Sequence, residues 1–245
     1  MIYYLGTYLY ETVETLSFLR LLNSISFRAI AGAITALLFI ILFGGRMILH
    51  FYLSGQRDMP RNYASFSTEG DSVKTYGGLL LVTGVLVSVL LWTKLHTTFV
   101  MLCIVAVLWF AALGLVDDRL KVRHGSSDRG LSEATKLILQ SVYGLVFGLI
   151  YVIEDLSPLP AGLPTQLYLP FLKNPIFDLS WGYIPFAIFT VIAIANSVNI
   201  ADGIDGLAVV PVAFAIAVFG VFAYVASHAE ISAFLIFPFM PGVGE

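Results

Sequence analysis

The sequence predicts an all-α integral membrane protein that crosses the bilayer about six times. The chain of 245 residues is 58% hydrophobic and only 12% charged, whereas soluble domains carry about 25% charged residues. Its mean hydropathy is +0.89. Six apolar stretches approach the roughly 20 residues that a helix needs to cross a bilayer. Because lipid offers no hydrogen-bond partners to the backbone, we expect each stretch to be helical.

The expected spans follow one another along most of the chain, and the second is the shortest. We expect residues 1–20, which mix aromatic and acidic side chains, to lie in the membrane interface rather than to cross it. No internal repeat or domain boundary is visible, which predicts a single integral membrane domain over residues 1–245. The spans are Phe27–Phe51, Gly77–Trp92, Thr98–Val116, Leu137–Ile153, Trp181–Ile200 and Leu207–Ser227.

The distribution of Lys and Arg predicts the orientation. If six helices alternate in direction, residues 44–76 and 117–136 share one face, which carries nine of the 13 basic residues. We therefore expect this face to be cytoplasmic and the N-terminus to be outside. The outer connection over residues 154–180 holds half of the ten prolines. Within it, residues 165–171 and 175–180 could pair as a short hairpin.

Two polar groups reach the same predicted face from different spans. Asp117 and Asp118 fall at the end of the third span. Asn199, Asp202 and Asp205 fall at the end of the fifth. Carboxylates brought close together resist ionisation unless a cation compensates them. Mg²⁺ is suited to this role because it takes oxygen ligands and shares them with substrate phosphates.

Two lysines, Lys121 and Lys136, stand on the loop between spans three and four and could hold phosphate oxygens. Carboxylates, an amide and lysines over an apolar floor suit phosphoryl transfer, which depends on positioning and charge neutralisation. Simpler interpretations remain. An Asp pair often only ends a helix, Asp205 could cap the next span, Asn199 could bond a neighbouring helix, and the lysines could be anchors. From the residue pattern alone, a cation carrier or another non-catalytic membrane protein stays open.

Four motifs carry a resemblance to a known family: "FRAI" (27–30), "GLVDDRLKV" (114–122), "GLSEATK" (130–136) and "NSVNIADGIDGLA" (196–208). In order and spacing they resemble the polyprenyl-phosphate sugar-1-phosphate transferases, and among these the phospho-N-acetylmuramoyl-pentapeptide transferases. The resemblance implies transfer from UDP-N-acetylmuramoyl-pentapeptide to undecaprenyl phosphate, giving lipid I and UMP for peptidoglycan synthesis. It also implies Mg²⁺ and a multi-pass enzyme of the bacterial cytoplasmic membrane with a cytoplasmic active site. A sibling transferase for another UDP-amino sugar is the alternative.

The resemblance assigns expected roles position by position. Asp117 and Asp118 match the active-site Asp pair, and Asp117 is the candidate that deprotonates or orients the lipid phosphate. Asn199 matches an asparagine near the metal and the phosphates. The other expected substrate-binding residues are Lys121 and Lys136 at the diphosphate, Asp202 and Asp205 at the nucleoside with Asp205 near the uracil, and Thr75, Asn196 and Gly203.

The chain departs from the family pattern in two places. In "EGDSVKTYGG" (69–78) the family's upstream lysine is missing, and Lys74 stands where a proline would be. The family has about ten spans, a third essential Asp, which would be the main metal ligand, and a histidine-rich loop, all of which would fall beyond Glu245. We therefore expect a fragment that ends before the seventh span and is inactive alone. The expected partners are the two substrates, the lipid bilayer and, as an option, a second copy in a homodimer, with no nucleic acid.

Overall fold

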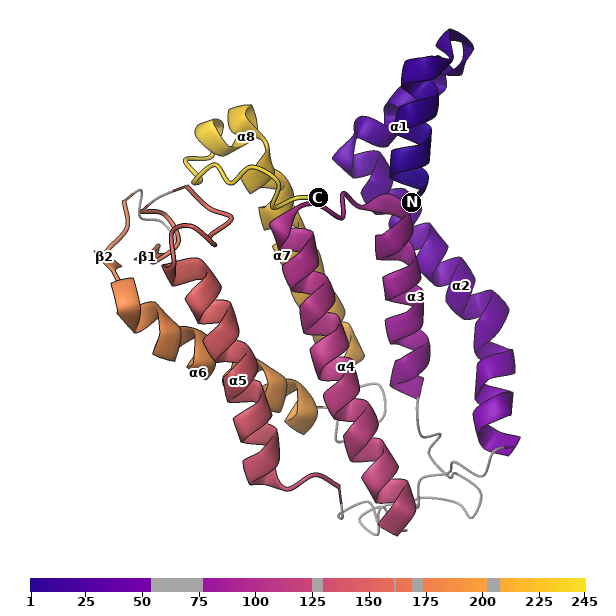
Figure 1. Ribbon diagram of the computed structural model, residues 1–245, viewed down its shortest axis with the longest axis vertical. Coiled ribbons are helices and arrows are strands. Elements are labelled where there is room, and N and C mark those ends of the chain that lie inside the picture. Colours follow the sequence, from indigo (N-terminus) through magenta and orange to yellow (C-terminus); the bar gives the residue numbers. More distant parts are fainter. Residues whose placement is uncertain (54–76, 125–129, 161, 169–173, 202–207) are drawn as a thin grey trace. The chain divides into compact units, whose positions relative to one another are not determined.

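The computed structural model describes residues 1–53, 77–124, 130–160, 162–168, 174–201 and 208–245. The order of its elements matches the predicted order of spans (Figure 1). The elements are α1 (Ile2–Thr12), the 3₁₀ helix η1 (Glu14–Asn23), α2 (Ile25–Leu53), α3 (Gly77–Trp92), α4 (Thr98–His124), α5 (Glu133–Val152), β1 (Gln166–Leu167), β2 (Phe177–Asp178), the 3₁₀ turn η2 (Ser180–Gly182), α6 (Tyr183–Ala201), α7 (Val209–Ser227) and α8 (Ala229–Phe234).

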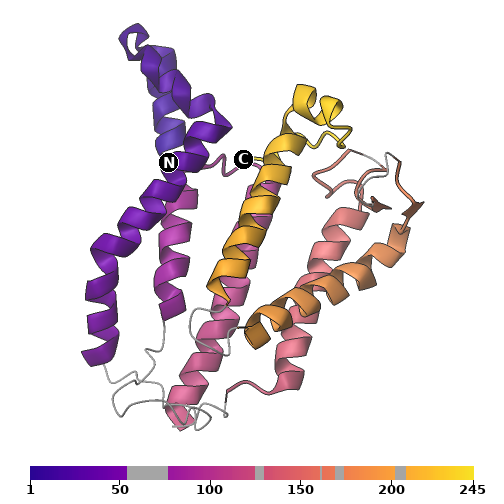
Figure 2. The same cartoon turned by 180° about the vertical axis from the view of Figure 1, so that it is seen from behind.

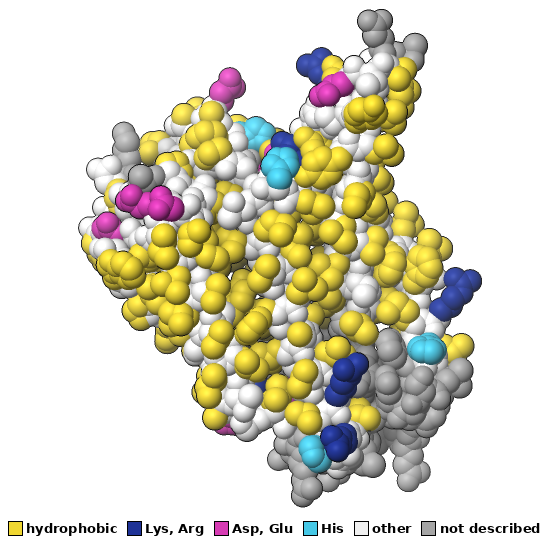
Figure 3. Space-filling model, viewed as in Figure 1, with side chains coloured by type: hydrophobic (Ala, Val, Ile, Leu, Met, Phe, Trp, Pro, Cys, Tyr) yellow, Lys and Arg dark blue, Asp and Glu magenta, His cyan; other side chains and the backbone are white. Residues whose placement is uncertain are grey.

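The helices confirm the prediction of an all-α membrane protein. Among the described residues, five helical segments are long and apolar enough to cross a membrane, and α3 is a shorter apolar helix. On the face shown in Figure 3, hydrophobic side chains cover the lengths of the helices. On α7, the side chains of Phe214 and Phe219 are each 70% exposed. In a membrane, such exposed apolar side chains would contact lipid tails.

The helix that contains the third span is longer than the expected span. The third span was expected to end at Val116, but α4 continues to His124. Asp117 and Asp118 therefore lie inside the helix rather than at its end. The extension is favourable because Asp117 pairs with Lys121 one turn later, and because the basic side chains of the last turn complement the negative end of the helix dipole.

The chain divides into two compact units. The first comprises residues 1–95 and 103–136, and the second comprises residues 96–102 and 137–245. In the first unit α2 and α3 pack through small residues. The Ser88 hydroxyl donates to the Gly32 carbonyl at 2.7 Å, and a Cβ on Gly84 would lie 3.2 Å from Ile40. Such close approach is typical of membrane helices, which gain little from the hydrophobic effect when they pair.

The N-terminal helices of the first unit fold onto the start of α2, where the "FRAI" motif lies. Arg28 of this motif is only 5% exposed. Its guanidinium lies 4.9 Å from the centre of the Tyr3 ring, and the Lys94 ammonium lies 5.7 Å from the same ring. These are cation–π distances. Arg28 therefore helps to fix α1 against the helices that follow it.

In the second unit α5 and α6 pack against each other and cross at an angle (Figure 2). A Cβ on Gly144 would lie 2.7 Å from the Ile188 Cα, and one on Gly148 would lie 3.1 Å from the Ile184 Cα. The two backbones are thus nearly in contact. The connection between these helices contains the expected hairpin, in which β1 pairs antiparallel with β2 and Gln166 lies opposite Asp178.

Candidate functional site

Asp117 is the centre of the polar network that the structure describes in the first unit. Its side chain is 9% exposed, and both of its oxygens have partners. Oδ2 lies 2.8 Å from the Lys121 ammonium, and Oδ1 lies 2.9 Å from the Lys136 ammonium. The Leu131 backbone N–H donates to Oδ1 at 2.7 Å. The structure thus brings together three of the predicted site residues, from α4 and α5.

The local sequence explains this convergence. Lys121 follows Asp117 by one helical turn on α4, so the two side chains share a face. Lys136 lies in the first turn of α5, and Gly130 and Leu131 lead the chain into that helix. Just before α5, the Ser132 hydroxyl accepts from the Thr135 N–H at 3.2 Å, as a helix N-cap does. This cap fixes the start of α5 and therefore the direction from which Lys136 reaches Asp117.

Gly130 lies against the carboxylate. A Cβ at this position would lie 2.3 Å from Asp117 Oδ1 and 3.0 Å from Lys121 Cε. Asp117 Oδ1 can therefore occupy its position only because residue 130 has no side chain. The motif "GLSEATK" contains this glycine, but the sequence alone did not reveal what it faces. Asp118, the other member of the Asp pair, is half-buried on α4.

The second unit holds the other predicted residues that the structure describes, Asn196 and Asn199 on α6. The Asn196 side-chain amide donates to Gln140 Oε1 at 2.9 Å and to the Ile192 carbonyl at 2.8 Å. Gln140 is 5% exposed, so this is a buried bond between α5 and α6. Asn196, expected to bind substrate, thus uses its NH₂ group to join two helices. Asn199 is exposed near the end of α6.

Sequence reasoning missed Gln140, although a signal was present. Lys136, Gln140, Gly144 and Gly148 follow one another at four-residue spacing along α5 and therefore share one face. The last three are buried. A polar and two small residues at this spacing in an apolar helix indicate close contact with another helix.

Four predicted residues, Thr75, Asp202, Gly203 and Asp205, lie outside the described residues, as does Lys74. The expected meeting of the Asp pair with the polar turn that follows α6 therefore stays a prediction. Within the described part of the chain, no three His, Cys, Asp or Glu side chains are grouped so as to hold a metal ion. Asp117 does not fit as a Mg²⁺ ligand in this state, because ammonium groups contact both of its oxygens. The exposed Asn199 offers an amide oxygen, which is a suitable donor type.

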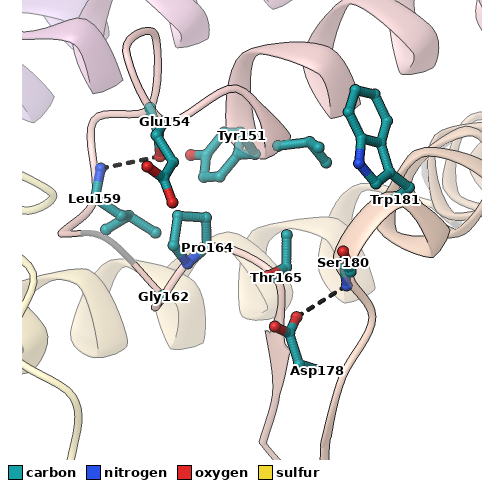
Figure 4. A pocket seen from close by; sticks show the side chains of 11 residues that line it. Tyr151, Glu154, Leu159, Gly162, Pro164, Thr165, Asp178, Ser180 and Trp181 are labelled. Atoms are coloured by element: carbon teal, nitrogen blue, oxygen red, sulfur yellow. Dashed lines mark hydrogen bonds between the residues drawn. The ribbon is translucent and has the colours of Figure 1, made fainter.

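A separate cavity of about 350 Å³ lies at the other end of α5, beside the hairpin (Figure 4). Tyr151, Glu154, Trp181 and Asp178 contribute to its lining, and no predicted site residue does. A hydrogen bond from the Thr165 side chain, and then one from the Ser180 N–H, lower the pKa of Asp178 below its ordinary value of 3.8. These bonds connect the hairpin to the start of α6.

Comparison with known proteins agrees with the resemblance in the motifs. The sequence profile of glycosyl transferase family 4 matches residues 98–243. The phospho-N-acetylmuramoyl-pentapeptide-transferase of Caulobacter vibrioides is 33% identical over 249 residues, which cover 100% of this chain and 67% of the relative. The proteins of that name from Chlorobium luteolum and Desulfovibrio desulfuricans are each 36% identical. Their matches cover 100% and 94% of this chain, and 65% and 62% of the relatives.

This chain thus spans about two thirds of the length of these curated relatives, or slightly less. The matched profile includes the Asp117 network, the Gln140–Asn196 bond and Asn199. With a profile match over more than half of its length, the chain belongs to glycosyl transferase family 4.

Proposed function

We propose that this chain supplies the transferase site that moves phospho-N-acetylmuramoyl-pentapeptide from UDP to undecaprenyl phosphate, releasing UMP and forming lipid I. Three relatives with the corresponding name match 94–100% of the chain. We place the enzyme in the bacterial cytoplasmic membrane, with the site on the cytoplasmic face. A homodimer is a further prediction, which cross-linking in native membranes would test.

The Asp117 network is the observation that carries the proposal. Two lysines converge on one half-enclosed point near the polar end of a predicted membrane span. Lysine ammonium groups bind phosphate oxygens as point charges, and a diphosphate that is cleaved at a membrane surface needs such charges. Catalysis of phosphoryl transfer consists mainly of positioning and charge stabilisation, so a cation pair beside an apolar surface is the machinery that this reaction requires.

The two phosphate-bearing substrates have different needs. The lysines would hold the diphosphate of the water-soluble substrate, while the exposed apolar faces of the neighbouring helices accommodate the polyprenyl chain. Mg²⁺, with oxygen ligands including Asn199, would add positive charge against the diphosphate. We expect Asp202 and Asp205 to bind the nucleoside, and Asp117, with Asp118 next to it in the chain, to orient or deprotonate the lipid phosphate.

The test measures UMP release. The chain would be assayed alone and joined to the part of the Caulobacter vibrioides relative that its match does not cover, with that relative itself as the positive control. We expect Mg²⁺-dependent release of UMP by the joined chain, lost in EDTA, when both UDP-N-acetylmuramoyl-pentapeptide and undecaprenyl phosphate are present. Release with UDP-N-acetylglucosamine instead would assign the chain to a sibling transferase. A folded joined chain that releases no UMP from either donor would refute the proposal.

A further inference from the structure

Three hydrogen-bond donors meet at one carboxylate in the first unit. The Lys136 ammonium and the Leu131 N–H both reach Asp117 Oδ1, at 2.9 and 2.7 Å, while Lys121 reaches Oδ2 at 2.8 Å. Their charge exceeds that of the carboxylate, since two ammonium groups face a single negative charge. The group of four therefore carries a net charge of about +1 when the side chains are ionised.

A phosphate oxygen makes the same demands on its surroundings as a carboxylate oxygen. Both accept charge-assisted hydrogen bonds from ammonium groups and from backbone N–H groups. Leu131 precedes the Ser132 N-cap of α5, and its N–H donates to the Asp117 carboxylate rather than to a helix carbonyl. A diphosphate, with more charge than Asp117, would compete well for all three donors.

We propose that the Asp117 carboxylate occupies the phosphate site of this chain when no substrate is bound, and that the Leu131 N–H is a third phosphate donor beside Lys121 and Lys136. This inference rests on the proposed function. When the diphosphate binds, one of its oxygens takes the place of Oδ1, and the Asp117 side chain swings away from the lysines. In the substrate-free state, Asp117 thus holds both ammonium groups in position for the phosphate.

Gly130 leaves the room that a phosphate oxygen would need at this site. A Cβ on residue 130 would meet Asp117 Oδ1 at 2.3 Å, so it would also meet a phosphate oxygen at the same point. The backbone at Gly130 does not have a positive φ, so an alanine there is disfavoured by the neighbouring atoms rather than by its own conformation. Gly130→Ala thus closes the site without changing any charge.

The experiment measures binding of inorganic diphosphate to the 245-residue chain in detergent by calorimetry, in EDTA so that the protein donors alone are probed. Even an exposed ion pair restrains a charged group by about 1.4- to 5-fold, and the Asp117 side chain is mostly buried, so releasing two lysines should strengthen binding by at least about 2-fold in Asp117→Asn. Asp118→Asn removes the same formal charge one residue away and should strengthen binding less. Lys121→Ala and Lys136→Ala should each weaken it.

Gly130→Ala, although it too would push Asp117 aside, should weaken diphosphate binding because the site itself is filled. Gly114→Ala is the matched control, since it lies on the same helix as Asp117 and a Cβ there meets nothing within 4 Å in the described structure. It should bind diphosphate as the unaltered chain does. If Asp117→Asn fails to fold, as judged by circular dichroism and gel filtration, the comparison of Gly130→Ala with Gly114→Ala still tests the inference.

Either of two outcomes would overturn the inference: equal gains in Asp117→Asn and Asp118→Asn, or unchanged binding in Gly130→Ala. These outcomes are distinguishable from a failure of the proposed function. Diphosphate binding does not depend on turnover, so the expected pattern together with no UMP release in the joined chain would remove the reaction and leave the phosphate site.

Discussion

Replacing Gly144 with alanine is expected to force α5 and α6 apart. The added Cβ would lie 2.7 Å from the Ile188 Cα and 3.3 Å from the Ile188 backbone nitrogen. Backbone atoms cannot rotate away as the end of a flexible side chain can, so the helices themselves must move. Overpacking of this kind typically costs about 1–3 kcal/mol, whereas replacing a helical glycine with alanine by itself gains about 0.5–1 kcal/mol.

A second glycine separates these two effects. In Gly220→Ala, on α7, the added Cβ meets nothing within 4 Å in the described structure, so only the gain in helix propensity applies. The free energy of unfolding of Gly144→Ala should therefore lie about 1–3 kcal/mol below that of Gly220→Ala. Reversible unfolding in mixed micelles with increasing sodium dodecyl sulfate, followed by circular dichroism, measures the difference. Equal stabilities in the two variants would refute the close contact between α5 and α6.

Three further predictions concern hydrogen bonds. A double-mutant cycle between Gln140→Met and Asn196→Leu should give a coupling energy of about 0.6 kcal/mol in the same unfolding assay, as is typical of hydrogen bonds between membrane helices. A coupling energy of zero would mean that this hydrogen bond does not stabilise the contact between α5 and α6. Because the pKa of Asp178 is lowered, its hydrogen bonds stabilise the hairpin above an ordinary pKa of 3.8, and this contribution is lost as the pH falls through the lower, folded-state pKa. The fluorescence of the nearby Trp181 should therefore change under acidic conditions in the unaltered chain but not in Asp178→Asn, and identical titrations would contradict this. In the joined chain, Asp205→Asn should weaken UMP binding by about 1.5–3 kcal/mol, the usual value of a hydrogen bond to a charged group. It should also raise KM for the UDP substrate more than it lowers kcat. An unchanged UMP affinity in calorimetry would exclude Asp205 from the nucleoside site.

The membrane helices could be predicted from sequence because their signal is compositional. Long apolar runs between polar segments give nearly the bounds that the structure has, and Gly77–Trp92 was predicted to the residue. The end of α4 could not be predicted in this way, because the residues from Asp117 onward are polar whether or not they are helical. The i, i+4 pair of Asp117 with Lys121 favours the helix.

The composition of the site was easier to predict than its contacts. The sequence identified Asp117, Lys121 and Lys136 as members of one site, but it assigned the lysines to phosphate and Asp117 to the lipid substrate. That these groups pair with one another depends on where α5 begins relative to α4, which is a tertiary feature. The role of Asn196 likewise depends on Gln140, 56 positions earlier in the chain, which residue type alone does not reveal.

The contact between α2 and α3 has a consequence for how far sequences of this kind can drift. Many apolar side chains of α2, such as Leu37 and Ile41, are exposed, and there one aliphatic residue serves as well as another. At Gly32, Gly84 and Ser88 the neighbouring helix leaves little room, so the choice is limited to small residues. Lineages that share this fold can therefore exchange most of their membrane-facing residues while a few small ones stay fixed, and a low overall identity is compatible with an unchanged path of the backbone.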